Sequence, residues 1–326
     1  MTMHHFLPTN LVHEIQKVDF QTLEEHFLEG LLFKYFPAII PMERRKNYYR
    51  LWVARWNKIR LLENELLSWQ AEIKAQDLQV VLLKGMALVH TLYPDLGSRY
   101  MSDLDLLIGP NSLPDLERIL INHGYHPVKD SKWKANRHKM TYEKQSPDAI
   151  LIIEVHSRLF FHVDLVTTDL LPWIYSPYKI LNIEMNLLHM IGHVAFSHTF
   201  IKFFWLIDIY RFISLNEQNI NWNYFFKLIE KYRLKNSYAM VFFILKHFFK
   251  YQIAHEKTSL TWFKKTIYQH LLTFSFLMEN QNLKIRYILI KHLTKDHLWT
   301  AIKYDFYWLI DYLNQQLKQK TRPLQK

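Results

Sequence analysis

Residues 99–109 read Arg-Tyr-Met-Ser-Asp-Leu-Asp-Leu-Leu-Ile-Gly, and this stretch decides the fold. Apolar residues surround Asp103 and Asp105, which predicts a β-strand over residues 102–108. Side chains alternate between the faces of a strand, so both carboxylates are expected on one face. Two like charges on a buried face repel each other and lose hydration, and a divalent cation such as Mg²⁺ would neutralise them. The stretch therefore predicts a metal-dependent site, suited to phosphoryl or nucleotidyl transfer.

Short apolar runs on either side of this strand predict the rest of a small sheet. Residues 79–83 indicate a buried strand that leads through Lys84-Gly85 into a short helix over residues 86–93, stopped at Pro94. A second helix, over 111–122, has an early proline and a glycine at its end. The remaining strand candidates are residues 137–144 and 149–156.

Both flanks of this region show helical periodicity. The sequence before the core is helical over 10–76, and the sequence after Pro172 has helix candidates near 183–197, 201–215, 222–232, 235–253 and 259–278. We expect an α+β fold, with a small mixed-sheet core flanked by helical N- and C-terminal parts. The expected divisions are residues 1–77, 78–165 and 166–326.

The composition excludes several classes of site. The chain has 326 residues but only 6 glycines, and neither the Gly-rich dinucleotide motif nor the P-loop motif occurs. Cysteine is absent, which excludes disulfide-linked partners, thiolate zinc sites and cysteine nucleophiles and suits a reducing compartment. No signal peptide and no long apolar run is visible, so we expect a cytoplasmic protein without a membrane partner.

The net charge of +11 leaves two interpretations open. A basic surface favours polyanions such as nucleotides or nucleic acid, whereas solvated lysines on a soluble protein give the same total. Charge alone does not decide between them.

A third acid, Glu154, interrupts the apolar strand candidate at 149–156. A charge there is costly unless it has a partner. Three carboxylates on adjacent strands would suit two Mg²⁺ ions that stabilise the attacking and leaving oxygens of an in-line displacement. A solvated strand end is the alternative interpretation of the Asp-x-Asp pair. His156 would share the face of Glu154 and serve as a base or as a partner of the ligands.

Lys84 and Gly85 stand at a strand-to-helix turn, which suits phosphate binding. Backbone N–H groups at a helix N-terminus attract phosphate oxygens, and glycine permits their close approach. Lys84 would add positive charge near a triphosphate, unless it is an ordinary loop lysine. Arg99, just before the acidic strand, would bridge the acids or contact phosphate.

These motifs together resemble a known family. The order Leu-Leu-Lys-Gly-x-x-Leu, Arg-x-x-Ser-Asp-Leu-Asp-Leu-Leu-Ile and Ile-Glu-Val-His-Ser-Arg-Leu is similar to the uncharacterised nucleotidyltransferase family of the DNA polymerase β superfamily. Residues 187–193 and 205–209 resemble the helical C-terminal half of that family. The resemblance covers residues 78–235.

The resemblance implies a polymerase β-like core in which Asp103, Asp105 and Glu154 bind the metal. It also implies a phosphate-binding turn at Lys84 and Gly85. The chain departs from the superfamily there, because Met86 follows Gly85 where a serine or glycine is usual.

Two features of the C-terminal part are also candidates. By analogy with the superfamily, a helix that carries Lys202, Trp205 and Asp208 would close over the nucleotide, with Lys202 and Asp208 as candidate nucleotide-binding residues. A core tryptophan with a surface Lys–Asp pair is the alternative. His189 and His193, four residues apart, favour packed or capping histidines over zinc, because the glutamate of the zinc-protease motif is absent.

We therefore expect an Mg²⁺-dependent nucleotidyltransferase, with Mn²⁺ as the alternative ion. It would transfer a nucleoside monophosphate from an NTP to a hydroxyl or phosphate acceptor by a two-metal mechanism. The acceptor is open among small molecules, proteins and tRNA, and a toxin that modifies tRNA ends would be a special case. The competing expectation is a non-catalytic nucleotide- or RNA-binding module that retains the fold.

Overall fold

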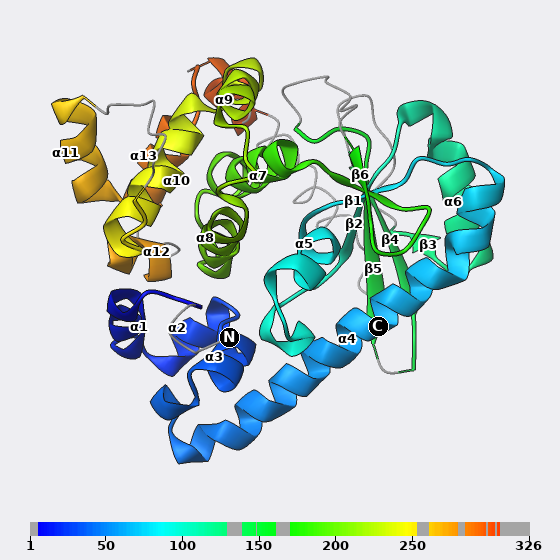
Figure 1. Ribbon diagram of the computed structural model, residues 1–326, viewed down its shortest axis with the longest axis horizontal. Coiled ribbons are helices and arrows are strands. Elements are labelled where there is room, and N and C mark those ends of the chain that lie inside the picture. The colour runs from blue at the N-terminus through cyan, green and yellow to red at the C-terminus, as the bar shows by residue number, and fades with distance from the viewer. Residues whose placement is uncertain are drawn as a thin grey trace, which may run out of the picture.

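The N-terminal part of the computed structural model is helical, as the periodicity predicts. The structure describes residues 6–128, 139–147, 149–160, 170–252, 261–279, 284–297, 299–303 and 305–306. Its first helices are α1 (Thr9–Gln16), α2 (Phe20–Glu25), α3 (Glu29–Tyr35) and α4 (Met42–Ala75). Helix α4 runs along the molecule from these short helices to the sheet (Figure 1).

A mixed seven-stranded sheet forms the centre of the second region. Its strands are β1 (Val81–Leu82), β2 (Leu104–Leu107), β3 (His126–Pro127), β4 (Lys139–Gln145), β5 (Ile150–His156), β6 (Leu170–Pro172) and β7 (Lys179–Leu181). They lie in the order β3-β4-β5-β2-β1-β7-β6. The β2–β5 and β1–β7 pairs are parallel, and the other neighbours are antiparallel. The acidic strand β2 is thus central, between β5 and β1.

Helices follow the strands at the expected places. Helix α5 (Lys84–Leu92) comes directly after β1, and α6 (Leu113–Asn122) comes after β2. The C-terminal helices are α7 (Ile183–Ile191), α8 (Phe204–Asn216), α9 (Trp222–Lys231), α10 (Lys235–Phe248), α11 (Trp262–Leu271), α12 (Phe274–Glu279) and α13 (Lys284–Leu293). The candidates near 183–197, 201–215, 222–232 and 235–253 are therefore confirmed in position, although α7, α8 and α10 are shorter. The candidate near 259–278 is divided into α11 and α12, and its first two residues lie outside the described residues.

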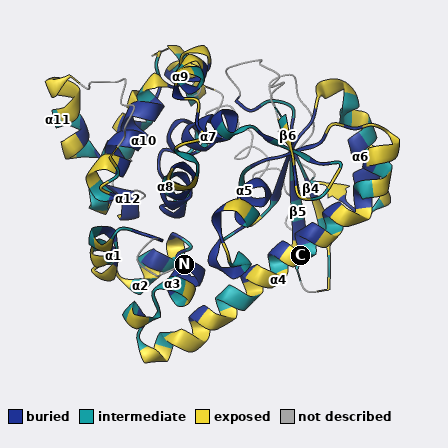
Figure 2. Ribbon diagram, viewed as in Figure 1, coloured by how far each residue is buried: buried dark blue, intermediate teal, exposed yellow. Residues whose placement is uncertain are grey.

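Two apolar clusters hold these elements together. One joins the second half of α4 and α6 to the sheet, around Trp69 and Tyr142. The other joins the N-terminal helices to α7, α8 and α10, so segments far apart in sequence share a core. Helices α5, α7 and α8 lie between the sheet and the outer C-terminal helices and are largely buried (Figures 1 and 2). Elements from distant parts of the described chain therefore pack around these central helices.

Helix α7 continues into a π-helix, Gly192–Ser197. Close packing accounts for the glycine at its start, because a Cβ on Gly192 would lie 2.3 Å from the ring of Phe160. At its end, the Lys295 ammonium donates a hydrogen bond to the Phe196 carbonyl at 2.6 Å. A residue near the end of the described chain therefore fixes the wide turn.

Three details differ from the sequence-based expectation. The acidic strand is shorter than 102–108, and the helix after β1 begins at Lys84 rather than at residue 86. Two strands from the range 166–326, β6 and β7, join the sheet, although we expected only helices there. None of the described helices combines the length and apolar character needed to span a membrane.

Candidate functional site

Asp105 and Glu154 lie directly opposite each other in the centre of the sheet. Strands β2 and β5 run parallel, and their register pairs Asp105 with Glu154. Paired residues of neighbouring strands project to the same face, so the two carboxylates are adjacent. The sequence predicted strands that carry these acids, and the structure brings the acids together.

Asp105 is buried and has two cationic or polar partners. The Lys84 ammonium donates a hydrogen bond to Oδ1 at 2.7 Å, and Nε2 of His156 lies 3.0 Å from the same oxygen. Burial alone would raise the pKa of Asp105, but the Lys84 charge and the contact with His156 hold it well below its usual value. Asp105 is therefore ionised at neutral pH.

Glu154 contacts a cation on the other side. Its Oε1 lies 2.5 Å from Nζ of Lys139 on β4, and its Oε2 lies 3.7 Å from Nε2 of His156. Burial lowers the pKa of His156 despite the neighbouring acids, so its imidazole is neutral at physiological pH. His156 thus lies between two carboxylates as a neutral group.

Asp105, Glu154 and His156 are arranged so that one ion could contact all three. Each offers a ligand atom, and these atoms lie within 4.8 Å of one another. Carboxylate oxygens suit Mg²⁺ and Mn²⁺, and an imidazole nitrogen is a frequent ligand of the transition ions. The donor set therefore fits a divalent cation, and its nitrogen fits Mn²⁺ better than Mg²⁺.

Asp103 belongs to the same cluster of charge without belonging to that ligand group. It precedes β2, and its Oδ1 accepts a hydrogen bond from the Ser102 hydroxyl at 2.9 Å. Burial, together with repulsion from Asp105 and Glu154, raises the pKa of Asp103 to about 6. The negative charges of Asp105 and Glu154 therefore destabilise the ionised form of Asp103.

The protein itself neutralises part of this negative charge. Lys84 pairs with Asp105, and Lys139 pairs with Glu154. The sequence suggested a divalent cation as the neutralising group, whereas in the structure these lysines neutralise part of the charge. Lys58 acts on Asp103 without a direct ion pair, so among the described residues one of the three carboxylates, Asp103, has no cation in contact. That carboxylate favours a further cation.

The Lys84-Gly85 turn has an unusual backbone. Lys84 has a φ of 45°, in the left-handed region that is costly for a residue with a side chain. Helix α5 starts there without a side-chain cap, so its first N–H groups have no capping side chain. A Cβ on Gly85 would lie 2.5 Å from Sδ of Met101, so this position has no room for a side chain. Met86 is fully buried in the core.

Arg99 and Asp208 form a buried ion pair with each other. Nη2 of Arg99 lies 2.8 Å from Oδ2 of Asp208, and the Tyr93 hydroxyl donates to Oδ1 at 2.5 Å. Burial alone would lower the pKa of Arg99, and the Asp208 carboxylate raises it instead. The pair joins α8 to the segment before β2 and presents no unpaired charge to a phosphate.

Lys202 is directed to the N-terminal helices. Its ammonium donates a hydrogen bond to the Glu25 carbonyl at 2.5 Å and lies 4.6 Å from the centre of the Phe27 ring. The structure therefore does not bring Lys202 to the acidic cluster. Its expected phosphate contact stays a prediction that this arrangement does not support.

Two contacts of the acids were not predicted from the sequence. His156 was expected as a base or an outer partner, and the structure places its nitrogen among the possible ligand atoms. The spacing Glu-Val-His was the signal, because residues two apart share a strand face. Lys139 carried no signal, because its approach to Glu154 depends on the pairing of β4 with β5.

One family model matches most of the chain. The model is described as "Uncharacterised nucleotidyltransferase", and it covers residues 13–250. The matched residues include β1, α5, β2, β5 and the helices through α10. No curated protein is similar enough to the chain to count as a match.

Proposed function

Because the chain belongs to the uncharacterised nucleotidyltransferase family, we propose that it transfers a nucleoside monophosphate from an NTP to a hydroxyl or phosphate acceptor, with release of pyrophosphate. The transfer depends on a divalent cation, Mg²⁺ or Mn²⁺. The proposal includes a polymerase β-like core, which the order of a Lys-Gly turn, an acidic strand and a third acid on its parallel neighbour supports.

One observation carries the proposal. Asp105 and Glu154 are adjacent in the central β2–β5 pair, with Asp103 within electrostatic range and, among the described residues, without a cation in contact. Buried carboxylates are costly in a fold that needs only packing. Their retention at the centre of the sheet supports a role in binding a cation and the phosphates that it carries.

The residues of the chain would act by binding and positioning. A bound divalent cation would supply positive charge for the reacting phosphate oxygens. Asp105, Glu154 and His156 would hold that ion, and Asp103 would join them when it is ionised. Lys84 is placed to exchange its contact with Asp105 for a phosphate oxygen, beside the uncapped N–H groups of α5. Catalysis by positioning and charge requires no covalent step on the protein.

The experiment measures three quantities: the binding of Mg-ATP, the release of pyrophosphate and the transfer of the labelled nucleotide. The four NTPs, labelled at the α-phosphate, are incubated with Mg²⁺ or Mn²⁺ and unfractionated tRNA, and label on tRNA or on the protein is counted. We expect Asp105→Asn and Glu154→Gln to lower transfer by at least about 10²-fold.

Glu65→Gln is the matched control. Glu65 has the same side-chain exposure as Glu154, 16%, and it also pairs with a lysine of β4, Lys144. Transfer that is equal in wild type, Asp105→Asn and Glu154→Gln would contradict the proposed mechanism. Binding of Mg-ATP without any transfer or pyrophosphate release would instead favour the non-catalytic binding module.

A further inference from the structure

Three histidines lie beside the acidic cluster, and the proposed chemistry does not use them. His189 is in α7, His193 is in the π-helix, and His198 follows it. A regular α-helix would place residues 189 and 193 on one face and carry residue 198 away from it. The π-helix widens the turn, and such insertions occur often at functional sites.

The rings of these histidines pack against one another and against one tryptophan. The ring centres of His193 and His198 are 4.4 Å apart, and those of His189 and His193 are 6.4 Å apart. Trp205 of α8 lies 4.6 Å from His193 and 5.1 Å from His198. We call His189, His193 and His198 the histidine cluster.

One buried polar atom of the histidine cluster lacks a partner among the described residues. His189 is only 4% exposed, and its Nδ1 is buried without a hydrogen bond among the described residues. His193 and His198 are only half-buried, and no side-chain hydrogen bond of either is found in that part of the chain. An unsatisfied buried polar atom costs about 1–3 kcal/mol, so the unpaired Nδ1 of His189 indicates an absent polar ligand.

The histidine cluster adjoins the proposed metal site. The Phe160 ring, four residues after His156, has its centre 5.9 Å from the centre of the His189 ring. The charges of Lys84 and Asp105 act on both His189 and His198, and Lys139 and Lys295 also act on His198. A ligand held by these imidazoles would therefore lie within electrostatic range of Lys84 and Asp105.

The imidazoles are neutral, which limits the chemistry of that ligand. Burial, with a smaller effect of the Lys84 charge, lowers the pKa of His189 to about 3. Burial likewise lowers the pKa of His198 to about 4 and that of His193 well below 6.5. Neutral imidazoles offer one N–H donor and one acceptor nitrogen, so they suit a hydroxyl better than a phosphate or carboxylate.

A metal ion is a poorer occupant. Among the described residues, the ligand atoms that lie close enough to share an ion belong to Asp105, Glu154 and His156. The atoms of the histidine cluster do not meet that condition. The histidine cluster therefore suits hydrogen bonding to a polar ligand better than coordination of an ion.

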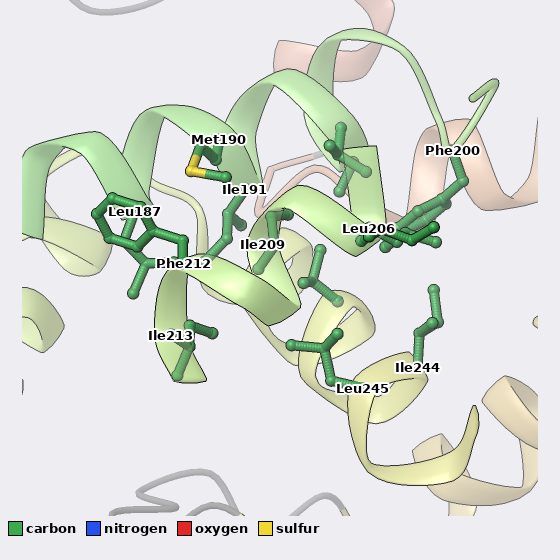
Figure 3. Close-up of a cluster of buried hydrophobic side chains, with 14 of the residues drawn as sticks. Leu187, Met190, Ile191, Phe200, Leu206, Ile209, Phe212, Ile213, Ile244 and Leu245 are labelled. Atoms are coloured by element: carbon green, nitrogen blue, oxygen red, sulfur yellow. The ribbon is translucent and has the colours of Figure 1, made fainter. Parts of the chain in front are cut away.

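The surrounding core fixes the position of the cluster. Leu187, Ile191, Leu206 and Ile209 pack from α7 and α8 on the elements that carry it (Figure 3). Lys295 holds the Phe196 carbonyl at the end of the π-helix. The imidazoles are thus held before a ligand arrives, as precise hydrogen bonding requires.

We propose that His189, His193 and His198 bind a hydroxyl group of a substrate beside the metal site. The inference rests on the proposed function and adds a ligand class to it. A hydroxyl there has two sources, the ribose of the NTP and the acceptor. The site accordingly favours an alcohol acceptor over a phosphate acceptor if the ribose is not the ligand.

Nitrogen-15 spectra of histidine-labelled full-length protein test this site directly, because each ring nitrogen reports its protonation and hydrogen bonding. Three probes are added in turn: Mg²⁺ with a non-hydrolysable ATP analogue, the 2′,3′-dideoxy form of that analogue, and glycerol added to the dideoxy complex. Substitutions His189→Phe, His193→Phe and His198→Phe assign the signals, and equilibrium dialysis measures nucleotide binding in the same samples.

Two results support the site and identify the hydroxyl. If the ribose is the ligand, the ribonucleotide shifts the cluster signals and the dideoxy form does not. His193→Phe then weakens binding of the ribonucleotide about threefold to tenfold and leaves the dideoxy form unchanged. If the acceptor is the ligand, only glycerol shifts the signals. His247→Phe on α10, with an exposed imidazole, is the matched control for both results.

Two results contradict the site. Cluster signals that none of the probes moves, or that both nucleotides move equally while glycerol has no effect, exclude hydroxyl binding. A wild-type chain that binds no Mg-nucleotide contradicts the proposed function instead. Bound nucleotide with unmoved histidine signals contradicts the hydroxyl site alone.

Discussion

Two groups of buried charge lie close together in this protein, and they differ in how fully their charges are paired. In the Arg99–Asp208 pair, the guanidinium and the Tyr93 hydroxyl together satisfy both carboxylate oxygens. In the acidic cluster of Asp103, Asp105 and Glu154, two lysines face three carboxylates. The first group is electrically balanced, and in the second Asp103 has no cation in contact among the described residues.

This difference separates a structural ion pair from a binding site. Both groups were expected to bind ligands: the acids because charge in an apolar strand is costly, Arg99 because it precedes that strand, and Asp208 by analogy with the superfamily. A balanced pair stabilises packing and has no capacity left for a ligand. An unbalanced cluster is costly until a cation arrives. The following predictions test that distinction.

Substitution of Asp208 should have the largest effect on stability. Asp208→Asn leaves Arg99 buried without its counter-ion, and we expect the free energy of unfolding to fall by about 3–5 kcal/mol. Urea denaturation measures the change. The Arg99→Met and Asp208→Leu double variant should recover part of the loss, because it removes both charges. A loss of Mg²⁺ binding in the folded Asp208→Asn protein would show that the pair is not merely structural.

The pH dependence of stability should depend on Asp103. Its pKa is about 6 in the folded chain and near 3.8 in the unfolded chain, so the folded chain holds the proton more tightly. The contribution of Asp103 to the free energy of unfolding is fully present below pH 3.8. It falls by about 2–3 kcal/mol as the pH rises through 6. We expect this decline in wild type without metal and its absence in Asp103→Asn. An identical pH profile in both proteins would contradict the assignment.

Divalent cations should stabilise the acidic cluster. At about 100 times its dissociation constant, Mg²⁺ or Mn²⁺ should raise the free energy of unfolding by about 2.7 kcal/mol. Glu154→Gln removes one ligand and should abolish most of that gain, whereas Glu65→Gln should keep it. Mn²⁺ should bind more tightly than Mg²⁺ if His156 is a ligand. Thermal denaturation at several metal concentrations measures these differences.

Lys202 should have the smallest effect. Its contacts are a carbonyl and an aromatic ring of the N-terminal part, so Lys202→Met should lower stability by less than about 1 kcal/mol. The dissociation constant of Mg-ATP should not change. A tenfold weaker binding of Mg-ATP would restore the expected phosphate contact of this lysine.

The sequence predicted the elements well where one local pattern decides them. Short apolar runs located β2 and β5, and helical periodicity located α7 to α10. The helix ending before Gly124 followed from glycine chemistry, and that glycine has a φ of 84°. Strands β6 and β7 were missed, because three-residue strands carry too little pattern to distinguish them from loops.

The residues of the candidate site could be predicted from the sequence, but most of their ionic contacts could not. The acids that meet at β2 and β5 were identified because charge in an apolar strand is costly. Their neutralisation by Lys84 and Lys139 was not, because it depends on a positive φ at one residue and on the register of β4. The Arg99–Asp208 pair joins residues 109 positions apart, and no local pattern links them.

The contact of Lys295 with Phe196 bears on how much of the chain forms a working unit. The family match ends at residue 250, yet this lysine supplies the hydrogen bond that completes the wide turn carrying His193. A fragment limited to the matched residues would keep the acids and lose that donor. Truncation at residue 250 should therefore loosen the turn that carries His193 and leave Asp105, Glu154 and His156 in place.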